Sequence, residues 1–148
     1  MKLNKKTTYG LRAMIELAVN WEKEGIYQKD IARKQDISFK FLDHIISNLK
    51  AAGLVVNAEG HKSGYKLVKN PANISVYDIY RAFESELAIV DCLNEEGLCK
   101  RRNSCAVKDV WEGLNRLIIN HMDSYSLKSL ADKQEIIDSE NISHVYYI

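Results

Sequence analysis

The sequence predicts a mostly α-helical fold with one small β-hairpin near its middle. Apolar residues recur at three- and four-residue spacing in several segments, which is the period of an α-helix. Two short apolar segments, 54–56 and 65–68, flank a polar loop that contains glycine, which is the pattern of a hairpin. Together these patterns favour a small helical domain that carries a two-stranded element.

Length and composition restrict the class of protein. The 148 residues fit one compact domain with an accessory element, and 46% hydrophobic residues can supply a core. No apolar run is long enough to span a membrane, and no apolar stretch follows the basic N-terminus as in a signal peptide, so we expect a cytoplasmic protein. Charge is uneven: residues 1–67 carry a net +5 and residues 68–148 a net −4. The first half therefore suits a polyanionic partner.

The first half of the chain predicts three helices and the hairpin. The expected helices cover about Asn4–Glu22 and Gln28–Lys34, and a third follows Ser38, whose hydroxyl can cap its first turn. Residues 35–37 form a tight turn, and Gly53 provides a left-handed helix end. The buried stripe of the third helix comprises Phe41, Leu42, Ile45, Ile46 and Leu49.

The second half predicts three further helices. Ser75 and Asp78 form a capping box for a helix to about Glu86, and a long helix covers about 106–125. A short helix follows to Ile137, and for the tail a strand, a packed segment and disorder all remain open. The long helix carries a heptad-like seam of Val107, Trp111, Leu114, Ile118, His121 and Tyr125. We therefore divide the chain into a domain at 1–86, a cysteine segment at 87–105, helices at 106–137 and a tail at 138–148.

Two short helices joined by a tight turn and followed by a hairpin form a winged helix-turn-helix, here at residues 26–67. The helix after Ser38 would enter the major groove of DNA, where Lys40 and His44 can donate and Asp43 can accept from a cytosine amino group. Backbone and side chains at the wing tip suit phosphates. A protein–protein module is the alternative. The candidate DNA contacts are Tyr9, Arg12, Ser38, Lys40, Phe41, Asp43, His44, Lys50, His61, Lys62, Ser63, Gly64 and Tyr65.

Three cysteines stand in the polar segment, with the spacing Cys92-x6-Cys99-x5-Cys105. Nothing indicates secretion, so we do not expect a structural disulfide. Three thiols so close in sequence can converge on one soft metal centre, either an iron–sulfur cluster or zinc, and the basic run 100–102 would stabilise thiolates. Three reduced, unligated thiols are the alternative.

An enzyme is not predicted. The four histidines, at 44, 61, 121 and 144, are scattered, and no glycine-rich nucleotide-binding loop is present. Gly60 and Gly64 are better explained as hairpin glycines, and His121 as a packed residue of the seam.

Several stretches together resemble one known family over about residues 1–135. They are Met1–Leu3, Tyr9–Ala13, Asp30–Ala32, Ile37–Ser38, Phe41–Leu42, Leu49–Val55, Ser63–Leu67 and Asp91–Leu93. This pattern resembles the IscR/NsrR/CymR-type winged-helix transcriptional regulators. The resemblance implies a homodimer held by the long helix, binding to double-stranded DNA at a palindromic operator, and repression. In cysteine-bearing members it also implies a [2Fe-2S] or [4Fe-4S] cluster on Cys92, Cys99 and Cys105.

The sequence departs from the family pattern at the fourth cluster ligand and in the recognition helix. Lys108 stands where IscR-like members have histidine, and Thr8 where nitric-oxide sensors have an acidic residue. A protonated lysine has no lone pair for iron. Asp109, Glu95, Glu96, an external thiol or solvent remain open as fourth ligand. Regulation by thiol oxidation, by zinc, or through a partner protein or small molecule therefore stays a second hypothesis.

The DNA-reading residues also differ from those of many relatives. Asp43-His44 stands where many have Glu-Gln, so the operator sequence cannot be transferred, and Ser63 replaces the usual wing glycine.

Overall fold

The computed structural model describes residues 2–23, 25–60, 64–94 and 99–145. Within these ranges it confirms the predicted class, with six α-helices and one small antiparallel sheet. The helices are α1 (Lys5–Val19), α2 (Gln28–Gln35), α3 (Phe39–Ala51), α4 (Val76–Arg81), α5 (Lys108–Asp123) and α6 (Leu127–Val145). The strands are β1 (Ile26–Tyr27), β2 (Val55–Asn57) and β3 (Gly64–Leu67).

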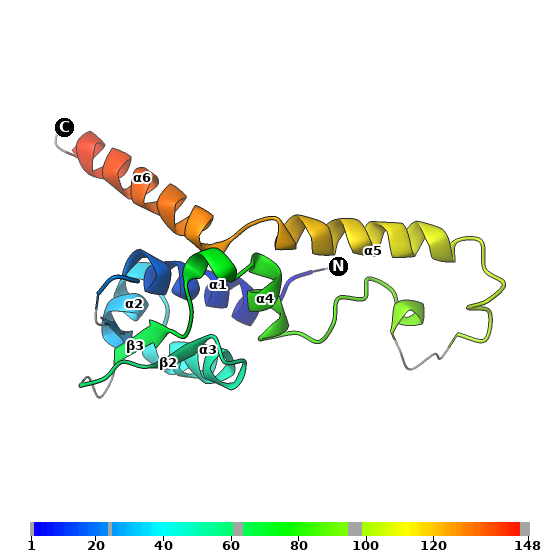
Figure 1. The fold of residues 1–148 in the computed structure, drawn as a ribbon, viewed down its shortest axis with the longest axis horizontal. Helices are drawn as coiled ribbons and strands as arrows, with labels where there is room; N and C mark the ends of the chain where they lie inside the picture. The colour runs from blue at the N-terminus through cyan, green and yellow to red at the C-terminus, as the bar shows by residue number, and fades with distance from the viewer. Residues whose placement is uncertain (1, 24, 61–63, 95–98, 146–148) are drawn as a thin grey trace.

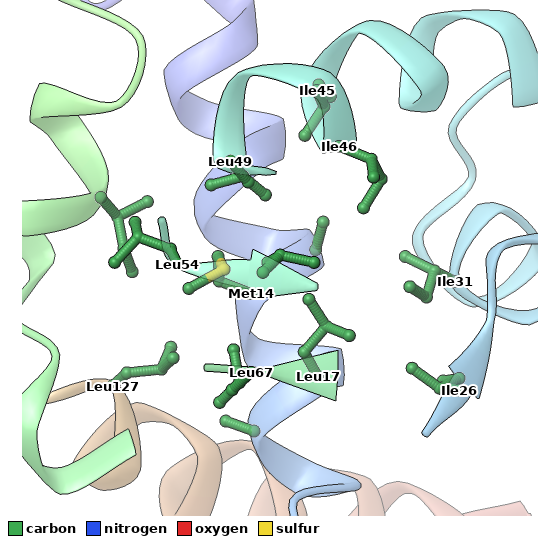
Figure 2. Packing of buried hydrophobic residues seen from close by; sticks show 14 of the residues in the cluster. Met14, Leu17, Ile26, Ile31, Ile45, Ile46, Leu49, Leu54, Leu67 and Leu127 are labelled. Carbon is green, nitrogen blue, oxygen red and sulfur yellow. The ribbon is translucent and has the colours of Figure 1, made fainter. Parts of the chain in front are cut away.

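Helix α1 is the centre of the compact part of the molecule (Figure 1). It contacts α2, α3, α4, α6 and β3. Figure 2 shows its Met14 and Leu17 between side chains of α3, such as Leu49, and Leu127 of α6. These side chains are at most 2% exposed, so one continuous core joins the first helix to the last.

The predicted turn between α2 and α3 is confirmed at both of its ends. Asp36 ends α2 in a left-handed conformation with φ of 50°. Two residues later Ser38 caps α3, because its hydroxyl accepts from the backbone N–H of Phe41 at 3.2 Å. Gly53 has φ of 71° after α3, as predicted for a left-handed helix end.

The sheet has the order β1-β3-β2, with β3 antiparallel to both neighbours. The hairpin of β2 and β3 was predicted, and Val56 lies opposite Lys66. Strand β1 was not predicted, because two residues are too few to produce a periodic pattern. Its pairing of Ile26 with Tyr65 ties the wing to the start of α2.

Two helices, α1 and α4, end earlier than predicted. Helix α1 stops at Val19 rather than Glu22, where Asn20 caps it and donates from its amide to the Glu16 carbonyl at 2.8 Å. Helix α4 stops at Arg81 rather than Glu86, because the chain turns there and lays Phe83 against α1.

The C-terminal helix is longer than predicted. Helix α6 continues through the expected boundary at 138 to Val145, so a strand at 141–145 is excluded. No glycine or proline interrupts this stretch, and Gln134 donates to Asp138 one turn later at 2.8 Å. Of the predicted tail at 138–148, residues 146–148 lie outside the described part.

Helices α5 and α6 both extend beyond the compact part of the molecule (Figure 1). The segment between α4 and α5 runs out beside α5 and includes a short 3-10 helix, η2, at Asp91–Leu93. No described helix has the length and apolar character needed to cross a membrane.

Gly10 lies where the ring of Phe83, just after α4, packs against α1. A glycine inside a helix costs stability relative to alanine, so it needs a reason. A Cβ at this position would collide with the ring of Phe83 at Cε2 and Cζ. The glycine therefore allows Phe83 to pack on α1.

We predict that Gly10→Ala lowers the free energy of unfolding by about 1–3 kcal/mol, because the added methyl displaces the Phe83 ring. In a Phe83→Ala background the same change should be neutral or stabilise by up to about 1 kcal/mol, since only helix propensity remains. Urea unfolding of the four proteins measures both effects. An equal loss in the two backgrounds would contradict this account of Gly10.

Candidate DNA-binding face and cysteine segment

Helix α3 presents a polar face to solvent, as the sequence predicts. Leu42, Ile45, Ile46 and Leu49 are buried, which fixes the rotation of the helix on the domain. Phe41, also predicted for the buried stripe, is only half-buried at its edge. Lys40, Asp43, His44 and Ser47 are exposed on the other side. The apolar stripe thus holds the helix while the polar face stays free for a partner.

A buried amide stands behind this face and was missed by sequence reasoning. Gln28, the first residue of α2, is 2% exposed and donates from Nε2 to Oδ1 of Asp43 at 2.6 Å. A glutamine at a helix start gives no signal in the sequence, because its partner is fifteen residues away.

Arg12 lies in a polar network that joins α1 to the end of α2. Its Nε donates to Oε1 of Gln35 at 2.8 Å, and its Nη2 donates to the Gln35 carbonyl. Gln35 donates in turn to Glu16 at 2.6 Å, and Lys34 pairs with Glu16 at 3.3 Å. Glu16 is only 5% exposed, so its charge needs these partners.

The same network bears on the predicted phosphate contacts. Arg12 lies 5.0 Å from the centre of the Tyr9 ring, and that ring packs edge-on against Phe41 at 5.7 Å. A guanidinium has five N–H groups, so donors remain for a phosphate. A DNA contact by Tyr9 or Arg12 stays a prediction. Arg12 also has a structural role that the sequence did not indicate, because it joins α1 to the end of α2.

The base of the wing is tied to the end of α3. Lys50 donates to Oδ1 of Asn57 at 2.7 Å, and its ammonium lies 5.8 Å from the centre of the Tyr65 ring. Gly64 is buried and Tyr65 half-buried. The three candidates at the wing tip, His61, Lys62 and Ser63, lie outside the described residues.

The predicted helix at about 106–125 is slightly shorter in the structure, so Val107 and Tyr125, the two ends of the predicted seam, flank α5, and no residue of α5 is buried. Of the seam residues, Val107 is 53% exposed, Leu114 43% and Tyr125 43%. Trp111 and His121 are also exposed, Ile118 is half-buried, and the His121 ring packs against Tyr125 at 5.2 Å. Val110 and Leu117, which the heptad pattern missed, are 59% and 67% exposed and widen the apolar face.

Cys92, Cys99 and Cys105 are half-buried and form no disulfide. In the part of the chain that is described, no three His, Cys, Asp or Glu side chains are grouped to hold a metal. The expected convergence of the cysteines is therefore not present in this arrangement. Glu95 and Glu96 lie outside the described residues, and Lys108 is paired with Glu112 at 3.3 Å.

The cysteine segment is instead positioned by an amide on α5. Asn115 donates from Nδ2 to the Leu87 carbonyl at 2.9 Å and accepts from the Ile89 N–H at 3.1 Å. These two bonds satisfy both ends of the amide. The start of the cysteine segment is thus fixed to the helix that carries the apolar seam.

A hollow of about 610 Å³ lies between the end of α1, residues 70–72 and α6. It contains none of the predicted site residues. Its Lys128 pairs with Asp132 at 2.9 Å, and this hydrogen bond raises the pKa of the lysine. Such exposed ion pairs add little stability. We assign no role to the hollow, because none of the predicted site residues lines it.

Comparison with known proteins decides the family. The model of the Rrf2 family, described as an iron-dependent transcriptional regulator, matches residues 3–133. The chain belongs to the Rrf2 family. Protein rrf2 of Nitratidesulfovibrio vulgaris is 30% identical over 130 residues, covering 88% of this chain and 87% of that protein.

Solved structures of this family have the same fold. IscR of T. potens has a TM-score of 0.72 at 31% identity and covers 92% of this chain and 90% of its own. The oxidised form of CymR from Staphylococcus aureus has a TM-score of 0.70 at 31% identity, with coverage of 88% and 96%. This Rrf2 protein is accordingly a transcriptional regulator of the DNA-binding type and not an enzyme.

Proposed function

We propose that this Rrf2 protein acts in the cytoplasm as a homodimeric repressor that binds a palindromic operator through α3 and the wing. The proposal rests on one observation: the same chain exposes two different surfaces that the rest of the described chain leaves uncovered. One is the exposed polar face of α3, and the other is the apolar seam of α5.

The polar face of α3 suits the major groove. Lys40 and His44 supply donors for phosphates or base edges, and Asp43 supplies an acceptor, so the face combines positioning and reading contacts. The N-terminal half of the chain carries the net positive charge that attracts the phosphate backbone. The ties of Lys50 to the wing and of Arg12 to α2 keep the reading elements in one orientation.

The seam suits a second copy of this chain. An isolated helix with so much exposed apolar surface is costly in water, and a two-fold dimer buries the same face on both copies. Two α3 helices would then read two half-sites about one turn of DNA apart, which requires a palindromic operator.

The three cysteines suit a sensing element. Their soft sulfur donors fit an iron–sulfur cluster or zinc, and a cluster bound there would supply a centre that iron, oxidants or nitric oxide alter. Cys92, Cys99 and Cys105 would hold it, whereas Lys108 would not, because its ammonium lacks a lone pair. Asn115 would pass a change in this segment to the dimer helix.

A second candidate is a thiol switch with no metal. Its support is that the three half-buried thiols are not grouped as ligands in the described residues. The relative CymR from S. aureus is known in an oxidised form. Control by a partner protein or small molecule would leave the cysteines without a sensing role.

The DNA-binding face is tested with Lys40→Ala. Loss of a phosphate contact should weaken binding to all duplexes alike and reduce the slope of log K against log salt by about one. Electrophoretic or fluorescence titrations at several salt concentrations measure this. Lys133→Ala, which removes an exposed charge from α6, is the control and should bind like the unchanged protein. A Lys40→Ala loss that does not depend on salt would remove this residue from the phosphate contacts.

The dimer is tested with Leu114→Glu. A carboxylate in the seam would be buried without a partner, so sedimentation should show monomers that bind a full operator weakly. Asn120→Glu places the same charge on α5 away from the seam and should leave the dimer intact. An intact Leu114→Glu dimer would exclude α5 as the interface.

The sensing element is tested on protein purified without oxygen. A cluster predicts visible absorbance with iron and sulfide near stoichiometric amounts, both lost in Cys92→Ala. Colourless protein with zinc, or a disulfide formed on oxidation, would favour the second candidate. Unchanged operator regulation after replacing all three cysteines by alanine would exclude them as the sensor.

A further inference from the structure

The strongest unassigned feature is the contact between a buried amide and an exposed carboxylate. Gln28 is 2% exposed, and its Nε2 donates to Oδ1 of Asp43 at 2.6 Å and to the Phe39 carbonyl at 3.3 Å. Asp43 lies on the exposed face of α3. A residue of the helix before the turn therefore holds a side chain of the recognition helix.

The direction of this contact is fixed by chemistry. The carboxylate of Asp43 and the carbonyl of Phe39 can only accept, so the NH₂ group of Gln28 must face both of them. A hydrogen bond from an N–H group to a carboxylate is stronger than one between neutral groups, and here the two atoms are 2.6 Å apart. Because the glutamine is buried, it has little freedom to follow Asp43 elsewhere, and the carboxylate is held instead.

The consequence concerns how Asp43 meets DNA. Its second oxygen, Oδ2, has no hydrogen-bond partner in the described part of the chain. A freely rotating carboxylate would turn away from the phosphates, which repel it. A held carboxylate instead presents one acceptor in a fixed direction and loses less conformational entropy when it binds.

We propose that Gln28 is a positioning residue for base recognition, which fixes Asp43 so that its free oxygen accepts from a cytosine amino group in the major groove. Cytosine fits because its N4 amino group is a donor in the major groove and its edge has no acceptor beside it. This inference rests on the proposed DNA binding through α3. It gives a specificity role to a residue that touches no DNA.

A purely structural role for Gln28 makes a different prediction. Its bond to Phe39 lies at the first turn of α3, so its loss could simply loosen the helix. Such loosening would weaken binding to every sequence. Loss of positioning would instead change the preference at one base pair and spare the others.

The experiment separates the two roles by a double-mutant cycle. The unchanged protein first selects its preferred operator from a library of random duplexes. Dissociation constants are then measured for that operator and for versions with each half-site base pair replaced in turn. The proteins are the unchanged chain, Gln28→Met, Asp43→Ala and the double variant. Methionine keeps the volume of glutamine and removes its donors.

We expect the unchanged protein to prefer cytosine at one position of each half-site by about ten- to a hundredfold. Asp43→Ala should abolish that preference and leave the others. Gln28→Met should reduce the cytosine preference severalfold. In the Asp43→Ala background the same substitution should not change the base preference at that position.

Asp43→Asn provides a second readout that does not depend on stability. The amide of Gln28 would still donate to Oδ1, so the new NH₂ group must face outward and donate. The preferred base should then change from cytosine to one with a major-groove acceptor, and Gln28→Met should weaken this new preference as well.

Two results would overturn the inference. One is an equal loss for all duplexes in Gln28→Met, with the cytosine preference intact. The other is an Asp43→Asn protein whose preference is unchanged by Gln28→Met. Failure of the proposed function is distinct, because then the unchanged protein would select no sequence from the library.

Discussion

The burial of α1 is the constraint on which the rest of the structure depends. This helix packs on α2, α3, α4, α6 and strand β3. Met14 has no exposed surface, and Gly10 allows Phe83 to approach closely. Since α2, α3, α4 and α6 all pack on α1, the orientation of α3 relative to the rest of the molecule is set here.

Polar contacts add direction to this apolar packing. Hydrophobic burial is non-directional, so it can hold α3 on the domain without fixing each surface side chain. The Arg12–Gln35–Glu16 network fixes the end of α2, and Gln28 fixes Asp43. Each of these contacts gives a buried polar group a hydrogen-bond partner. Removing only one of the two partners would leave the other buried and unsatisfied, which costs free energy. Together these contacts order the polar face of α3, which in the proposed DNA complex would be the reading surface.

The features predictable from the sequence are the local ones. The Ser38 cap, the Ser75–Asp78 capping box and the Gly53 helix end each involve residues a few positions apart, and the structure has all three. The buried stripe of α3 follows from helical period alone. The family resemblance rested on such short stretches, and the match over residues 3–133 confirms it.

The features that could not be predicted connect distant parts of the chain. Gln28 and Asp43 are fifteen residues apart, and Asn115 reaches back twenty-six residues to Ile89. The end of α6 was also predicted wrongly, because this helix is largely exposed beyond Ala131 and has no clear apolar face there, so it produces no periodic signal. The spacing of the three cysteines did not predict their arrangement, because thiols that are close in sequence converge only if the backbone between them folds back on itself. Such a convergence is not present in the described residues.

The part of the molecule around α1 to α3 is fully packed within one chain, whereas α5 and the cysteine segment are not. The reading half has a closed core, and its buried polar side chains have partners within the same chain. Helix α5 has no buried residue, and the cysteine segment beside it is fixed at its start by Asn115. A second chain that covers α5 would therefore order the segment next to the cysteines as well as the interface. Because the same helix carries the seam and holds that segment, in the proposed dimer a chemical change at the thiols would act first on the interface between the two chains. The altered interface would then change the spacing of the two α3 helices.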